Sequence, residues 1–141
     1  MKVLKFGGTS VANAQNIKLV LEIVEQKSRE DKLIVAVSAF SGVTDLLLSA
    51  AQKASSKDDS YRDVVLQIEK KHLEAIKELI PANEQTALLH YCKKNISLLE
   101  TLLDGCYLLG ELTARTSDMI VSFGELLSSY IIAEAMKQKL A

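Results

Sequence analysis

The spacing of hydrophobic residues predicts two short strands joined by one helix at the start of the chain. Residues 3–6 form a short, largely apolar run that ends at Gly7 and Gly8, as expected of a strand that enters a tight turn. Residues 11–30 place apolar side chains at helical intervals. Residues 33–37 (LIVAV) are a continuous run rich in β-branched side chains, typical of a strand buried on both faces. This order predicts a βαβ unit with parallel strands and a right-handed crossover.

Helical spacing dominates the rest of the chain. Four further helices are predicted, over residues 42–54, 61–79, 84–109 and 118–139. The expected caps are Thr9 or Ser10 for the first helix and Thr116 or Ser117 for the last. Two strands are too few for an independent sheet, and the last helix has neither a glycine cap nor a following strand. We therefore expect residues 1–141 to be the first part of a domain in a larger α/β protein.

Composition and charge narrow the classes of partner. The formal net charge of the 141 residues is −1, which gives no basic surplus for nucleic acid or an anionic membrane. No uncharged apolar run approaches the roughly 20 residues of a membrane span, and the first residues lack the apolar core of a signal peptide. Cys92 and Cys106 have no metal-ligand spacing and are interpreted as reduced core thiols. These features predict a cytoplasmic protein without nucleic-acid, membrane or metal-ligand sites.

The segment "KFGGTS" after the first strand has the chemistry of a phosphate loop. Gly7 and Gly8 let backbone N–H groups approach a ligand that a Cβ would keep away, and a strand-to-helix turn favours an anion. Lys5 can add a positive charge beside the turn. The lysine precedes the glycines, so this is not a Walker A loop. The alternative is that the two glycines form only a tight turn and that Lys5 is a solvated surface residue.

The segment "VSAFSGVTD", residues 37–45, repeats this arrangement after the second strand. Gly42 leads into a helix, and the hydroxyls of Ser38 and Thr44 can donate hydrogen bonds to a carboxylate or phosphate. Because ligands of open α/β sheets bind at the carboxyl ends of the strands, both loops are expected to line one crevice. Alternatively, Ser38 only ends a strand and Thr44 only occupies a first helical turn.

The chain offers no arrangement typical of a protein nucleophile with its base. His72 and His90 lie on predicted helices without partners at ligand spacing, and we interpret both as structural or surface residues. Asp45 and Glu111 are interpreted as solvated or capping residues.

Three segments together resemble one known family. "KFGGTSVAN" resembles the N-terminal signature of the aspartokinases, in the amino-acid kinase superfamily. "VSAFSGVTDLL" is similar to the family's second glycine loop, and "SFGELLSS", residues 122–129, resembles its Ser-x-Gly-Glu helix segment. The opening looks closest to the kinase part of bifunctional aspartokinase/homoserine dehydrogenases. The resemblance implies a three-layer α/β fold of the carbamate-kinase type, with residues 1–141 as the N-terminal, substrate-binding part of the catalytic domain.

The implied activity is ATP-dependent phosphorylation of the β-carboxylate of L-aspartate to 4-phospho-L-aspartate, the first step toward threonine, methionine, lysine and isoleucine. The residues implied for the ATP phosphates are Lys5, Phe6, Gly7 and Gly8, with Lys5 also stabilising the transferring phosphoryl group. The residues implied for aspartate are Ser38, Thr44 and Glu125, with Glu125 as a buried carboxylate that pairs with the α-ammonium. Mg²⁺ would enter with ATP, and NADP would be used only if a dehydrogenase domain follows. The full-length protein is expected to be a homo-oligomer.

Parts of the family's site have no counterpart in these residues. The arginine for the substrate side chain, an organising aspartate and the strands around adenine come from later sequence in the family. Arg115 precedes the "SFGE" segment, whereas the family's arginine follows it, so that role is not transferred. We therefore expect the 141 residues alone to be inactive. The alternatives are a kinase of glutamate, acetylglutamate or a nucleotide, and a helical assembly module without activity.

Overall fold

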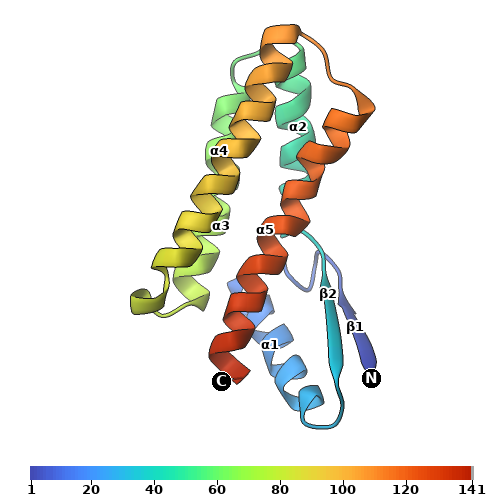
Figure 1. Cartoon of the computed structure of the whole chain (residues 1–141), viewed down its shortest axis with the longest axis vertical. Coiled ribbons are helices and arrows are strands. Elements are labelled where there is room, and N and C mark those ends of the chain that lie inside the picture. The colour runs from blue at the N-terminus through green and yellow to red at the C-terminus, as the bar shows by residue number, and fades with distance from the viewer. Residues whose placement is uncertain (141) are drawn as a thin grey trace.

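The computed structural model describes residues 1–140 as one elongated body with a small sheet at one end and a helical bundle at the other (Figure 1). The elements in chain order are β1 (Lys2–Phe6), α1 (Ala14–Ser28), β2 (Leu33–Val37), α2 (Val43–Ser55), α3 (Tyr61–Leu79), a 3₁₀ turn (Ala82–Glu84), α4 (Thr86–Leu109) and α5 (Ala114–Leu140). Helix α5 runs along the whole body, from the outer end of the bundle to α1 (Figure 1). The predicted βαβ unit followed by long helices is confirmed.

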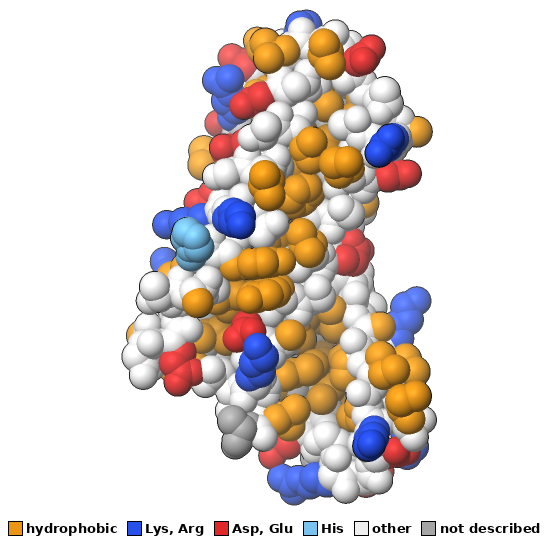
Figure 2. Space-filling model, viewed as in Figure 1, with side chains coloured by type: hydrophobic (Ala, Val, Ile, Leu, Met, Phe, Trp, Pro, Cys, Tyr) orange, Lys and Arg blue, Asp and Glu red, His pale blue; other side chains and the backbone are white. Residues whose placement is uncertain are grey.

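The two strands are parallel and in simple register, from Lys2 opposite Leu33 to Phe6 opposite Val37. Helices α1 and α5 both contact β2, and every second strand residue is half-buried beneath them. The other face is open, with Val3 65% and Ile34 50% exposed, and Figure 2 shows hydrophobic side chains gathered over the strands. The expectation that residues 33–37 are buried on both faces is therefore wrong, because the described helices cover one face only.

The hydrophobic core lies between the helices and follows the predicted apolar faces. The residues expected inside the first helix are all buried: Val11, Ala14, Ile17, Val20, Leu21 and Val24. Helix α2 lies at the centre of the bundle and contacts α3, α4 and α5, and five of its residues are buried. The loop after β2 leads directly into α2, so the packing of α2 in the core fixes the position of the end of this loop.

Four helices begin at other residues than the sequence predicted: α2 and α4 begin one and two residues later, and the starts of α1 and α5 differ by three and four residues. Helix α1 begins at Ala14, because the Oδ1 of Asn13 accepts a hydrogen bond from the N–H of Asn16 at 2.9 Å. Helix α5 begins at Ala114, one residue after Thr113. The Oγ1 of Thr113 accepts from the N–H of Thr116 at 3.1 Å. The caps are thus Asn13 and Thr113, and the predicted caps among Thr9, Ser10, Thr116 and Ser117 are wrong.

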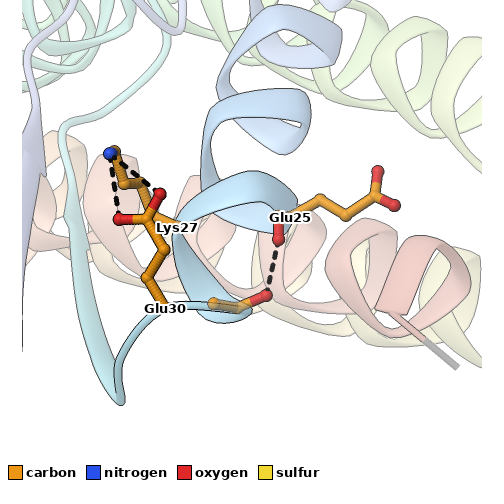
Figure 3. Close-up of polar contacts among 4 residues, drawn as sticks. Glu25, Lys27 and Glu30 are labelled. Atoms are coloured by element: carbon orange, nitrogen blue, oxygen red, sulfur yellow. Dashed lines mark hydrogen bonds and ion pairs between the residues drawn. The ribbon is translucent and has the colours of Figure 1, made fainter.

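Polar side chains contact one another at the C-terminal end of α1, where the chain turns toward β2 (Figure 3). The Nζ of Lys27 lies 3.1 Å from a carboxylate oxygen of Glu30, and the Oγ of Ser28 donates to the carbonyl of Glu25 at 2.8 Å. Exposed ion pairs of this kind contribute little to stability.

Helix α5 is long and apolar enough to cross a membrane by length and composition alone. Its most apolar 18-residue stretch is, however, 44% buried within the protein. Core helices meet the same criterion, and α5 packs against α1, α2, α3, α4 and β2, as a core helix does.

Candidate functional site

The loops after β1 and β2 lie side by side at the carboxyl ends of the strands, as the sequence predicts. The N–H of Ser38 donates to the carbonyl of Phe6 at 3.1 Å. A Cβ built on Gly8 would lie 3.9 Å from both the Oγ of Ser38 and the carbonyl oxygen of Ala39. The predicted phosphate loop and the predicted amino-acid loop therefore share one edge of the sheet.

Nothing within the described chain requires glycine at positions 7 and 8. Neither residue has a positive φ, and a Cβ on Gly7 would meet no atom within 4 Å. The turn itself is closed by a hydrogen bond from the N–H of Ser10 to the carbonyl of Gly7 at 3.0 Å. Among residues 1–140, the N–H groups of Gly7, Gly8 and Thr9 donate to no other residue. Consecutive free N–H groups beside open space suit an anion, and the tight-turn alternative does not account for the glycines.

The N-terminus of α1 does not follow these glycines directly, which changes the expected electrostatics. Five residues, 9–13, separate Gly8 from the first residue of α1. The side chain of Asn16 donates to the carbonyl of Thr9 at 2.9 Å and holds the intervening turn against the helix. An anion at the loop would meet loop N–H groups, and the expectation that the helix N-terminus contributes there is not supported.

Lys5 and Phe6 lie on opposite faces of the sheet. Lys5 is exposed on the open face, and within the described part of the chain its ammonium makes no ion pair or hydrogen bond. Phe6 is half-buried, packs against the hydrophobic core and lines a surface pocket together with Thr9 and Ser10. The positive charge of Lys5 is available to a ligand.

The second loop turns sharply into α2. Gly42 precedes the helix with φ +83°, a left-handed conformation that favours glycine. Thr44 follows in the first turn of α2 and is half-buried, as is Ser38 at the start of the loop. Ser38 therefore lies where the two loops meet, and Thr44 follows it in the first turn of α2.

Helix α5 brings the "SFGE" segment against this second loop. A Cβ on Gly124 would lie 2.8 Å from the Cβ of Ala39, so only glycine allows this approach. The Oγ of Ser128, which is fully buried, donates to the carbonyl of Ser38 at 2.7 Å. Glu125 follows Gly124 and is exposed. The expectation of a buried Glu125 is wrong, because the residue lies at the edge of the face of α5 that carries the buried Gly124 and Ser128, and the described chain leaves it exposed.

Helix α3 contacts the same loop from another direction. The ring of His72 stacks on the ring of Phe40, with centroids 5.1 Å apart and planes at 25°. The Nζ of Lys71 donates to the carbonyl of Ser41. Sequence reasoning missed this role of Lys71, Gly124 and Ser128, since only contacts between distant segments reveal it.

His72 is fully buried, which confirms the structural interpretation of this residue, and His90 is exposed at the surface. The Nδ1 of His72 lies 2.6 Å from the carbonyl of Ile68, while its Nε2 is buried without a partner in residues 1–140. Burial lowers the pKa of His72, and the nearby charge of Lys71 acts in the same direction, although the Ile68 carbonyl opposes them. The imidazole is therefore neutral at neutral pH.

The remaining titratable residues lie as predicted. Asp45 and Glu111 are exposed. Cys92 and Cys106 are buried free thiols, and burial raises the pKa of Cys92 to about 11. Residues 1–140 contain no group of three or more His, Cys, Asp or Glu side chains placed to hold a metal ion. The site can bind and orient an anionic ligand through N–H groups, hydroxyls and one lysine.

Comparison with known proteins identifies relatives over nearly the whole chain. The Amino acid kinase family matches residues 1–140. The chain is 38% identical over 136 residues to the bifunctional aspartokinase/homoserine dehydrogenase 2, chloroplastic, of Zea mays, a match that covers 96% of this chain and 15% of the relative. It is also 38% identical over 134 residues to aspartokinase 1, chloroplastic, of Arabidopsis thaliana, which covers 93% of this chain and 22% of that relative.

A solved structure has the same fold. Aspartokinase III of E. coli, in complex with aspartate and ADP, superimposes with a TM-score of 0.83 at 24% identity, covering 97% of this chain and 29% of that chain. The chain thus spans less than a third of the length of each of these proteins.

Proposed function

The chain belongs to the amino acid kinase family, and on that basis we propose that it supplies the phosphate and amino-acid contacts of an aspartokinase. The proposed reaction is transfer of the γ-phosphoryl group of ATP to the β-carboxylate of L-aspartate. The names of the maize and Arabidopsis relatives and the aspartate and ADP bound to the E. coli enzyme support this choice of substrates. The observation that carries the proposal is the loop at Gly7 and Gly8: its N–H groups have no hydrogen-bond partner in residues 1–140, and a Cβ on Gly8 would lie 3.9 Å from the Oγ of Ser38.

In the proposed arrangement the loop of residues 7–9 binds a phosphate through its N–H groups, and Lys5 neutralises charge on the transferring group. Ser38 and Thr44 donate hydrogen bonds to the amino acid, and Glu125 pairs with its ammonium group. The exposed position of Glu125 makes it accessible to a ligand that approaches over α5.

The chemistry requires no protein nucleophile, because the substrate carboxylate is itself the nucleophile. Catalysis then consists of positioning the two reactants and stabilising negative charge. Mg²⁺ would neutralise charge on the ATP phosphates. No residue of this chain is assigned to the metal, since the described residues offer no cluster of metal ligands.

Self-association belongs to the same proposal. The edges of the two-stranded sheet carry unpaired backbone groups, and its outer face exposes Val3 and Ile34. Both features favour contact with further strands, either from another copy or from another segment. Sedimentation velocity over a range of concentrations measures whether the 141 residues associate.

Binding of L-aspartate to the 141-residue protein tests the proposal. We expect saturable binding by equilibrium dialysis at millimolar ligand, with L-glutamate binding much more weakly because its side chain is one methylene longer. Thr44→Val should weaken aspartate binding, whereas Thr101→Val, a matched change on the exposed surface of α4, should not. Preference for L-glutamate, or equal binding by the Thr44 and Thr101 variants, would contradict the assignment.

A further inference from the structure

Residues from two helices hold the loop after β2 at four consecutive positions, 38–41. At Ser38, the carbonyl accepts a hydrogen bond of 2.7 Å from the Oγ of Ser128 on α5. At Ala39, the methyl group packs against α5 at Gly124, where any Cβ would overlap it at 2.8 Å. These two contacts fix the first half of the loop against α5.

Helix α3 holds the second half of the loop. The ring of Phe40 is stacked on the buried ring of His72, and the carbonyl of Ser41 accepts a hydrogen bond from the Nζ of Lys71. A Cβ on the next residue, Gly42, would lie 3.7 Å from the same Nζ. Adjacent side chains of α3 thus hold adjacent loop residues.

We infer that Lys71 and His72 of α3, together with Gly124 and Ser128 of α5, are positioning residues that form a clamp on residues 38–41. The clamp sets the place of the Ser38 hydroxyl and of Thr44, which follows three residues after Ser41. This inference rests on the proposed function in so far as residues 38–44 bind the amino acid. None of the four residues needs to touch the ligand.

The physical reason for a clamp is that the loop has few internal constraints. Residues 38–41 take part in two backbone hydrogen bonds outside the helices and strands, from the N–H of Ser38 to the carbonyl of Phe6 at 3.1 Å and from the N–H of Val43 to the carbonyl of Phe40 at 3.0 Å. Gly42 adds backbone freedom at the entrance to α2. A ligand that needs two hydroxyls in a fixed geometry binds more tightly when the protein holds that geometry beforehand, since less conformational entropy is lost on binding.

Amide hydrogen exchange of the free 141-residue protein tests the clamp without any ligand. Ser128→Ala and Lys71→Met each remove one hydrogen bond to the loop, and each should raise the exchange rates at Ser38 and Val43 by about fivefold, the scale of one net hydrogen bond. The matched controls are Ser129→Ala and Lys70→Met, which change the neighbouring exposed residues. The controls should leave the loop rates unchanged.

Aspartate binding provides the second readout. The two clamp variants should weaken L-aspartate binding several-fold and leave the affinity for Mg·ATP unchanged, because the loop at Gly7 and Gly8 is held by other contacts. Unchanged exchange at residues 38–43, or faster exchange spread evenly over the whole protein, would overturn the clamp. If the wild-type protein binds no aspartate, the proposed function fails, while the exchange rates still decide whether the clamp exists.

Discussion

At the scale of single residues, the site depends on groups that the fold leaves without partners. The N–H groups of residues 7–9 and the ammonium of Lys5 make no hydrogen bond or ion pair within the described chain. Glycines at positions 7 and 8 keep this region open although neither backbone conformation requires them. Such free groups are available for an anion.

Replacing Lys5 tests its assignment. Lys5→Ala should raise the Kd for Mg·ATP by about 10- to 100-fold, since it removes one charge-assisted contact with a phosphate. Lys2→Ala is the control, because Lys2 is an exposed lysine of the same strand, five residues before Gly7. Isothermal titration measures both constants, and equal affinities for the two variants would favour a merely solvated Lys5.

His72 should make stability depend on pH. Its pKa is lowered in the folded protein, so the stability due to the neutral imidazole is full above its unfolded pKa of about 6.5 and is lost as the pH falls below it. Urea unfolding between pH 7.5 and 5 should show this decrease. His72→Phe, which can retain an aromatic stack on Phe40, should flatten the decrease, whereas His90→Gln on the exposed surface of α4 should not. The same slope in all three proteins would exclude His72 as its source.

At the scale of elements, α5 determines how the loop after β2 is placed, and its glycine is the point of closest contact. A Cβ on Gly124 would overlap Ala39, while a Cβ on Gly105 of α4 would meet no atom within 4 Å. Both glycines are inside helices, so alanine improves helix propensity at either position. Only at Gly124 does the added methyl group also overlap a neighbour, so comparing the two variants isolates the effect of packing on stability.

Alanine at these two positions should have opposite effects on the free energy of unfolding. Gly105→Ala should stabilise the protein by about 0.5–1 kcal/mol through helix propensity. Gly124→Ala should destabilise it, because overpacking costs about 1–3 kcal/mol. Chemical denaturation measures both values. A Gly124 variant as stable as the Gly105 variant would mean that the contact with Ala39 is not tight.

The sequence predicted the elements well where the hydrophobic spacing is regular. It predicted them less well where a capping residue determines the start of a helix or a long-range contact determines which side chains are buried. The range of α3, residues 61–79, was predicted correctly, and the βαβ unit was recognised from two apolar runs. The starts of α1 and α5 were missed, because several hydroxyl and amide residues lie around each start and local sequence does not select Asn13 or Thr113 among them. The burial of Glu125 was predicted wrongly, since the motif fixes its identity and not the direction of its side chain.

At the scale of the whole molecule, two loops from the sheet end and two helices from the bundle converge on one edge. The sequence predicted which loops meet there, because parallel strands place their carboxyl ends together. It could not predict that α3 and α5 hold the second loop, since His72 and Ser128 contact residues 32 and 90 positions away along the chain. The open sheet face beside this edge leaves Lys5 free to reach a ligand.

The central claim is that residues 5–9, 38–44 and 125 form one site for a phosphate and L-aspartate. Amide chemical shifts of the ¹⁵N-labelled 141-residue protein, titrated first with Mg·ATP and then with L-aspartate, test it most directly. We predict that Mg·ATP shifts the amides of Gly7, Gly8 and Thr9, and that aspartate shifts those of Ser38, Thr44 and Glu125. Shifts confined to other regions, such as the exposed surface of α4, or no shifts with either ligand, would contradict the account.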